Sequence, residues 1–283
     1  MNTGYSINTL DYVNESIWFA KAYGVNLNLK NPTTIQDKLF WLNLYEPDIR
    51  KTRCADKLYI RDYCKEKIGI DLCIPILKVY DSVDDINLDD LPEQFVIKCT
   101  HGSSMNIVVK NKSTFNFEEA KEKLKKWMSI DYAFNNHYEF HYHDIPHKII
   151  VEEYKEDLKT NELRDYKFSC FNGVPKIMCA ITNLFKPNET TNYYDMDFKP
   201  LDMSLRSHPA NYDVVIEKPA GFEKMIEYAT KLSQDFKFVR VDFFSINGQV
   251  YLSEMTFTPH AIVWLNFEDK NHNIELGNML DIS

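Results

Sequence analysis

The sequence predicts an α+β fold, because strand-like and helix-like segments mix along the chain without the regular alternation of a doubly wound parallel sheet. Its 283 residues are enough for one large or two ordinary hydrophobic cores. Segment 221–236 is amphipathic and predicts a helix with one stripe formed by Phe222, Met225, Ile226, Ala229, Leu232 and Ser233. Two Asn-Gly pairs, at 172–173 and 247–248, lie between apolar runs and predict two β-hairpins.

The N-terminal third is expected to be mainly helical. Three segments there carry apolar residues at helical spacing: 16–22, 34–44 and 55–67. Thr33 or Thr34 can cap the second helix, and Gly69 follows the third. A short strand is expected from Ile74, followed by an acidic loop with one helical turn over residues 81–93.

The middle of the chain alternates between elements. Two apolar strands are expected around a polar turn at Gly102, followed by the helix FEEAKEKLKKWM, in which Glu119 and Lys123 are four residues apart. The segment 133–148 is rich in histidine and aromatic residues and predicts a loop with short helical pieces. KIIVEEY predicts a buried strand, and residues 190–202 an extended, irregular stretch.

Composition excludes several classes of protein. With 33 Lys and Arg against 42 Asp and Glu, the formal net charge is -9, which disfavours nucleic acid as a partner. The six cysteines form no C-x-x-C pair and are expected to be reduced thiols in a cytoplasmic protein. No apolar run approaches the ~20 residues of a membrane span, and the N-terminus lacks a signal-peptide pattern. The Rossmann, P-loop, G-x-S-x-G and H-E-x-x-H motifs are all absent.

The C-terminal hairpin carries the strongest indication of a site. In FVRVDFF, Arg240 and Asp242 project from one face because side chains alternate along a strand. A two-residue turn at Asn247-Gly248 would place Glu254 opposite Val241, on the other face. A three-residue loop starting at Ile246 would instead place Glu254 opposite Arg240.

We expect the three-residue loop, because it gathers Arg240, Asp242, Glu254 and Thr256 on one surface. Two carboxylates and an arginine on one face suit Mg²⁺ with phosphate, whereas splitting them would bury charge in each layer. The carboxylates are expected to share this face with Phe238, Phe244 and Leu252. The alternative is an edge hairpin with a merely solvated charged face.

The hairpin resembles the C-terminal motif of ATP-grasp ligases, in which R-x-D-F and a following E-x-N or E-x-T segment hold Mg²⁺ on the triphosphate. Four further motifs follow the order seen in the TupA-like ATP-grasp proteins of teichuronopeptide and capsular-polysaccharide gene clusters. They are C-A-D-K-L-Y-I-R-D-Y from Cys54, F-V-I-K-C-T-H-G-S-S from Phe95, I-I-V-E-E-Y from Ile149 and L-R-D-Y-K-F-S-C-F-N-G from Leu163. The resemblance implies an ATP-grasp fold, with a helical N-terminal region (1–92), a lid subdomain (93–150) and a larger antiparallel core with the Mg·ATP site (151–283).

The resemblance also implies roles for individual residues. Lys57 and Lys98 would contact the α- and β-phosphates, and Lys167, on the same strand face as Asp165, the γ-phosphate. Beside Lys98, the turn His101-Gly102-Ser103-Ser104 offers backbone N–H groups to a phosphate. The hinge would hold adenine and ribose through Glu152, Glu153 and Tyr154. Asp242 and Glu254 would bind Mg²⁺ and Arg240 the transferred phosphoryl group. Thr256 stands where an asparagine ligand is usual.

The activity implied is an ATP- and Mg²⁺-dependent carboxylate–amine ligase that works through an acyl-phosphate. Its substrates would be an amine or amino acid and a uronic acid of a surface polysaccharide or its precursor. Because phosphoryl transfer needs charge neutralisation and alignment, a site of lysines, arginine and Mg²⁺ suits it without an activated serine or cysteine.

Other readings of the sequence remain open. The D-x-D string Asp195-Met196-Asp197 favours, weakly, a glycosyltransferase that uses a nucleotide-sugar. A non-catalytic nucleotide-binding regulator and a small-molecule kinase are further alternatives. Four histidines crowd one loop, with a spacing that matches no known zinc pattern: His137, His141, His143 and His147.

Overall fold

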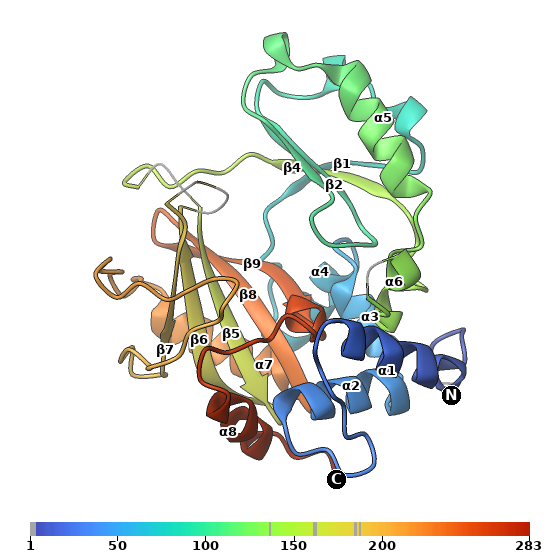
Figure 1. Cartoon of the computed structure of the whole chain (residues 1–283). Helices are drawn as coiled ribbons and strands as arrows, with labels where there is room; N and C mark the ends of the chain where they lie inside the picture. The colour runs from blue at the N-terminus through green and yellow to red at the C-terminus, as the bar shows by residue number, and fades with distance from the viewer. Residues whose placement is uncertain (1–3, 136, 161–162, 184–185, 187) are drawn as a thin grey trace.

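The computed structural model describes residues 4–135, 137–160, 163–183, 186 and 188–283. In this part of the chain two antiparallel sheets lie one above the other, with helices around them (Figure 1). The α+β class predicted from the sequence is therefore confirmed. None of the helices in the described ranges is both long enough and apolar enough to cross a membrane.

The smaller sheet has the strand order β1-β4-β2-β3. Its strands are β1 (Ile76–Tyr80), β2 (Phe95–Cys99), β3 (Asn106–Val109) and β4 (Ile149–Glu153). In β2, Phe95, Ile97 and Cys99 alternate with less buried residues, so this strand has one core face. Helix α5 (Phe117–Met128) covers that face and buries Leu124 against it (Figure 1).

The larger sheet has the strand order β7-β6-β5-β8-β9. Its strands are β5 (Arg164–Phe171), β6 (Val174–Thr182), β7 (Thr190–Tyr194), β8 (Phe238–Ile246) and β9 (Gln249–Thr256). Helix α7 (Phe222–Ser233) packs on one face, where Met225, Ala229 and Leu232 join Phe168 and Phe243 in one core. The predicted stripe of this helix is confirmed except for Ile226, which is only partly buried. The opposite face of the sheet carries the functional site over one part and an apolar cluster over the other.

The N-terminal helices pack beside the larger sheet. They are α1 (Val13–Ala22), α2 (Ile35–Tyr45), α3 (Ile49–Ala55) and α4 (Ile60–Ile68). Helix α2 starts as predicted at Thr34, whose hydroxyl accepts from the Asp37 amide while Asp37 caps back, a complete capping box. Helix α8 (Asn271–Met279), which the sequence did not predict, packs against α2.

Three predicted elements are corrected by the structure. The helix expected over 55–67 is interrupted, because Asp56 accepts hydrogen bonds from the Leu58 and Tyr59 amides and forms a turn before α4. The acidic segment 81–93 holds two short 3₁₀ turns rather than one. Residues 190–194, expected to be irregular, form strand β7.

The boundaries expected between the three regions stay a prediction. The smaller sheet takes β1 from before residue 93, and β4 spans the boundary at 150/151. The loop 133–148, apart from Asn136, which lies outside the described residues, contains the expected helical pieces, α6 (Tyr132–Asn135) and a 3₁₀ turn at Phe140–Tyr142.

Candidate functional site

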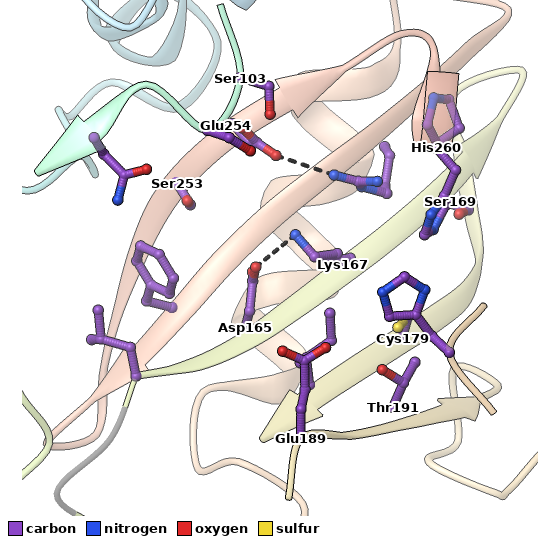
Figure 2. Close-up of a pocket in the computed structure, with 18 of the residues that line it drawn as sticks. Ser103, Asp165, Lys167, Ser169, Cys179, Glu189, Thr191, Ser253, Glu254 and His260 are labelled. Carbon is purple, nitrogen blue, oxygen red and sulfur yellow. Dashed lines mark hydrogen bonds and ion pairs between the residues drawn. The ribbon is translucent and has the colours of Figure 1, made fainter. Parts of the chain in front are cut away.

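A cleft of about 820 Å³ lies between the two sheets (Figure 2). Its walls come from β2 and β4 on one side and from the free face of the larger sheet on the other. Most of the predicted site residues line it: Lys57, Lys98, Ser103, Ser104, Glu152, Glu153, Tyr154, Asp165, Lys167, Arg240 and Glu254. Segments that are far apart in the sequence therefore meet in one cavity.

In the C-terminal hairpin, the charged residues share one face as predicted, but the turn and the register differ from those expected. Its turn has two residues, since Ile246 pairs with Gln249, so the expected three-residue loop is wrong. The register shifts instead between Asp242 and Phe243, where Ser253 is the extra residue of a β-bulge. This bulge changes the parity of β9 and brings Glu254 opposite Asp242.

The bulge also determines which of the three apolar residues expected beside the carboxylates lie on the cleft face. Phe238 and Phe244 line the cleft as predicted. Leu252 pairs with Phe243 and packs in the core beneath α7, so its expected place on the cleft face is wrong.

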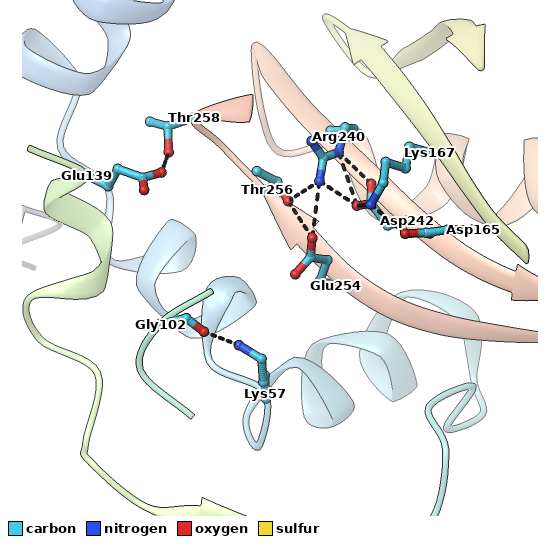
Figure 3. Close-up of polar contacts among 10 residues, drawn as sticks. All are labelled: Lys57, Gly102, Glu139, Asp165, Lys167, Arg240, Asp242, Glu254, Thr256 and Thr258. Atoms are coloured by element: carbon cyan, nitrogen blue, oxygen red, sulfur yellow. Dashed lines mark hydrogen bonds and ion pairs between the residues drawn. The ribbon is translucent and has the colours of Figure 1, made fainter. Parts of the chain in front are cut away.

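Five charged side chains form a compact network on the cleft face: Asp165, Lys167, Arg240, Asp242 and Glu254 (Figure 3). Arg240 donates from Nη2 to Oδ2 of Asp242 at 2.6 Å and to Oε1 of Glu254 at 3.1 Å. Lys167 lies 2.6 Å from Asp165 and 2.8 Å from Asp242. The Thr256 hydroxyl accepts from Arg240 at 3.1 Å and donates to Glu254 at 3.3 Å. The four predicted residues of the hairpin are therefore brought together.

Burial and neighbouring charges shift the pKa values of Asp165 and Asp242 in opposite directions. Burial alone would raise the pKa of Asp242, but Arg240 and Lys167 lower it to about 2. Burial raises the pKa of Asp165 to about 6, although Lys167 opposes the shift. One oxygen of Asp165, Oδ1, is buried without a hydrogen-bond partner. The site therefore combines a carboxyl group whose pKa is lowered by its cationic neighbours with one whose pKa is raised by burial.

The opposite wall supplies two lysines. Lys57 lies in the turn between α3 and α4, and its Nζ donates to the carbonyl oxygen of Gly102. Burial lowers the pKa of Lys57. Lys98 forms a 2.6 Å ion pair with Glu152 on the adjacent strand of the smaller sheet. The cleft thus has cations on both sides, as binding of a polyphosphate requires.

The turn after β2 is only partly exposed to the cleft. Ser103 and Ser104 line it, whereas the ring of His101 does not. His101 is fully buried, with Nε2 3.0 Å from the Trp127 carbonyl oxygen and its ring stacked on His147. The imidazole of His101 therefore packs inside the protein and does not line the cleft, and the expected contact of this turn's backbone N–H groups with a phosphate stays a prediction.

The hinge residues at the end of β4 line the cleft, but their side chains already have partners. Glu153 lies 2.6 Å from Lys155, and the Tyr154 hydroxyl donates to Glu156 at 2.7 Å. The carboxylate of Glu152 forms its ion pair with Lys98. Which glutamate binds a ribose stays a prediction.

The other clusters noted in the sequence do not join the cleft. Asp195 accepts from the backbone amides of Asp197 and Lys199 and shapes an exposed turn, and neither aspartate lines the cleft. The four histidines of loop 133–148 diverge, with His143 bonded to Asp131 at 2.7 Å and His147 to the Met128 carbonyl at 2.8 Å. Within the described ranges, no three His, Cys, Asp or Glu side chains gather as a metal-binding group.

Sequence reasoning missed several residues of the cleft, among them Cys179, His208 and His260. His260 directly follows Pro259 and has φ of 53°, in the left-handed region that non-glycine residues seldom occupy. Because His260 follows the C-terminal hairpin by only a few residues, its sequence position could have indicated that it lies near the site. His208 lies in a segment without periodicity, and only the fold brings it near His260, with ring centroids 5.8 Å apart.

Comparison with known proteins identifies the family of this chain. Residues 37–281 match the family model described as TupA-like ATPgrasp, so the chain belongs to the TupA-like ATP-grasp family. A curated relative, the D-alanine–D-alanine ligase of Sulfurimonas denitrificans, is 23% identical over 153 residues, which are 54% of this chain and 41% of that protein. The match thus spans less than half the length of that relative.

Solved structures of ligases are also similar. The D-alanine–D-alanine ligase of Bacillus anthracis complexed with ATP is 17% identical, with 87% of this chain and 72% of that chain covered and a TM-score of 0.48. The enzyme of the same name from Helicobacter pylori is 17% identical, with 89% and 68% covered and a TM-score of 0.47. At these values, the assignment rests on the family model.

The side chains of the cleft fit Mg²⁺ with a nucleotide phosphate. Mg²⁺ binds through one or two carboxylates together with phosphate oxygens and water, so it does not need three protein carboxylates. Glu254 lines the cleft on the same face as Asp242, whose carboxylate lies buried beneath it and accepts from Arg240 and Lys167, and Asp165 has an oxygen without a partner. The hydroxyl of Thr256 is already hydrogen-bonded, and its role as a ligand stays a prediction.

Proposed function

We propose that the protein is an ATP-dependent carboxylate–amine ligase that forms an amide bond through an acyl-phosphate. The observation that carries this proposal is the network of Lys167, Arg240, Asp242 and Glu254 on the cleft face of the larger sheet. Lys57 and Lys98 lie in the opposite wall. Such a cleft can hold a triphosphate between two sets of cations.

The proposed roles of the side chains are those that the family resemblance implies, and their positions around the cleft support them. Asp242 and Glu254, with Thr256 beside them, would hold Mg²⁺, which when bound neutralises phosphate charge and orients the triphosphate. Lys98, from the smaller sheet, and Lys57, from the turn between α3 and α4, would contact phosphates together with the backbone at Gly102, Ser103 and Ser104. The hinge at Glu152, Glu153 and Tyr154 would hold the adenosine. The region 93–150 would act as the lid over the core 151–283.

The chemistry requires charge stabilisation rather than a protein nucleophile. A carboxylate oxygen of the acid attacks the γ-phosphorus of ATP, ADP leaves, and an acyl-phosphate forms. The amine nitrogen then attacks the acyl carbon, the bond to the phosphate oxygen breaks, and the phosphate leaves with a proton from the amine. Arg240 and Lys167 would hold the phosphoryl group through both steps, since they are the cations beside the carboxylates.

The finer assignment is that the acid is a uronic acid of a surface polysaccharide or its precursor and that the protein works in the cytoplasm. Its support is the membership in the TupA-like family. The glycosyltransferase alternative gains nothing from the structure, because Asp195 and Asp197 shape an exposed turn away from the cleft lining.

The test is a screen for ADP release, with sugar acids combined with amines and Mg·ATP. We expect ADP and phosphate only when both substrates are present, and none from Asp242→Asn. Formation of ADP in the absence of the acid and the amine would contradict the proposed ligase activity. Phosphorylation of a hydroxyl group without release of free phosphate would contradict it as well.

A further inference from the structure

The cleft continues beyond Arg240 into an apolar compartment. Along the cleft face, Arg240 pairs with Ser169, and two residues further on Phe238 pairs with Phe171. The rings of Phe171 and Phe238 meet edge to face with centroids 5.3 Å apart. The face of the sheet thus changes from charged to aromatic within one step of side-chain alternation.

Helices α2 and α8 help to enclose this end. Leu39 of α2, Leu276 of α8 and Ile177 of β6 line the cleft there and belong to one apolar cluster. Their side chains are 1%, 6% and 6% exposed, so this end of the cleft is shielded from solvent. A cavity with such walls gains most from an apolar occupant.

The polar side chains at the mouth of the compartment are those of Ser169, Cys179, His208 and His260, and none of them is a carboxylate or a lysine. Figure 2 labels Ser169, Cys179 and His260 in the cleft, and Arg240 pairs with Ser169 between β8 and β5. The charged lining residues of the β6–β7 connection, Lys186 and Glu189, lie toward the other end of these strands, where Thr182 pairs with Thr190. Burial, with the charge of Arg240, lowers the pKa of His260 to about 3, so its imidazole is neutral at pH 7. A charged side group placed beyond Arg240 would be desolvated without a charged partner.

We propose that this compartment holds the side group of the amine substrate and that this group is apolar, either aliphatic or aromatic. The proposal rests on the ligase function above. Arg240 marks where the acyl-phosphate reacts, so the amine nitrogen lies beside it and the remainder of the amine extends past Ser169 toward Phe171 and Phe238. The acid, if it is a saccharide, is polar and bulky and stays in the open part of the cleft.

The first measurement is calorimetric titration of amines into protein saturated with Mg·ATP. We expect leucine and phenylalanine to bind at least about tenfold more tightly than glutamate or lysine, a ratio that corresponds to about 1.4 kcal/mol. Equal or tighter binding of the charged amino acids would overturn the proposal.

Substitutions of Ile177 test the location. Ile177→Phe fills the compartment and should move the preference toward alanine, whereas Ile177→Ala enlarges it and should move the preference toward phenylalanine, each by about tenfold. Val174→Phe is the matched control, because Val174 lies on the same strand, is 46% exposed and does not line the cleft. Unchanged preferences in both Ile177 variants would overturn the location.

The outcomes separate this proposal from the ligase function. ADP release with glucuronate or galacturonate that depends on glutamate and is indifferent to Ile177 would sustain the ligase and overturn the compartment. Binding of leucine or phenylalanine that responds to Ile177, without ADP release for any acid, would sustain the compartment and contradict the ligase. Mg·ATP binding by each Ile177 variant shows that it is folded.

Discussion

Asp242 and Glu254 differ in how much of the structure depends on them. Asp242 is fully buried and accepts from both Arg240 and Lys167, whereas Glu254 keeps 30% of its side chain exposed. Removing one partner of a buried ion pair leaves the other charge uncompensated, while a part-exposed pair contributes little to stability. The two carboxylates share a proposed role in Mg²⁺ binding, but the stability of the fold depends more on Asp242 than on Glu254.

We expect Glu254→Gln to abolish ADP release while it lowers the free energy of unfolding by less than about 1 kcal/mol. Asp242→Asn should also abolish ADP release but destabilise by about 3 kcal/mol, because Arg240 and Lys167 lose their shared carboxylate. Urea denaturation beside the ADP assay measures both effects. Activity retained in Glu254→Gln would contradict the assignment.

Buried histidine makes the fold sensitive to acid. Burial lowers the pKa of His141 to about 3, and its Nε2 has no hydrogen-bond partner. Between this value and about 6.5, the unfolded chain binds a proton that the folded chain does not, so stability is lost as pH falls through that window. His141→Phe should flatten the dependence of unfolding free energy on pH by up to about 1.4 kcal/mol per pH unit. Denaturation at pH 4.5 to 7 tests this, and an unchanged slope would contradict it.

At the scale of elements, two expectations for the C-terminal hairpin conflict: the turn that its sequence favours and the single face on which its charged residues are expected to lie. Asn247-Gly248 favours a two-residue turn, while the chemistry of Arg240, Asp242 and Glu254 requires one shared face. The structure satisfies both, because the bulge at Ser253 changes the parity after the turn. A bulge depends on packing across the sheet rather than on local propensity, so the shared face could be predicted from the sequence but its cause could not.

Helix α8 has no strong amphipathic pattern, which is why the sequence did not predict it. Its place is fixed by close approach to α2: a Cβ added at Gly277 would lie 2.1 Å from the Thr33 carbonyl oxygen. Gly277→Ala should therefore lower the free energy of unfolding by about 1–3 kcal/mol, the usual cost of overpacking. Urea denaturation tests this, with exposed Asn278→Ala as the control. A stability equal to that of the control would contradict the close packing.

At the scale of the molecule, the site exists only because two sheets meet. Lys98 and Glu152 belong to the smaller sheet, and Lys167 and Arg240 belong to the larger one. The order of motifs in the sequence predicted this assembly through the family resemblance. It did not predict His208 or the apolar end of the cleft, because these come from packing among segments that carry no local pattern.

If a nucleotide bridges the sheets, a change on the smaller sheet must affect affinity without disturbing the larger one. Lys98→Met keeps the length of the side chain and removes the charge. We expect Mg·ATP to bind about tenfold or more weakly to this variant, as the loss of a charge-assisted contact implies. Lys123→Met on the exposed face of α5 should bind like the wild type. Equal affinity in both variants would mean that the smaller sheet does not contact the phosphates.

In the proposed site, Asp242 and Glu254 share one face and bind Mg²⁺ under a nucleotide phosphate. Calorimetric titration of ATP into the wild-type protein and Glu254→Gln, each with and without Mg²⁺, tests it most directly. We predict saturable binding to the wild type that strengthens markedly with Mg²⁺, and loss of that Mg²⁺-dependent gain in the variant. No uptake of Mg·ATP by the wild type, or an unchanged gain in Glu254→Gln, would contradict the account.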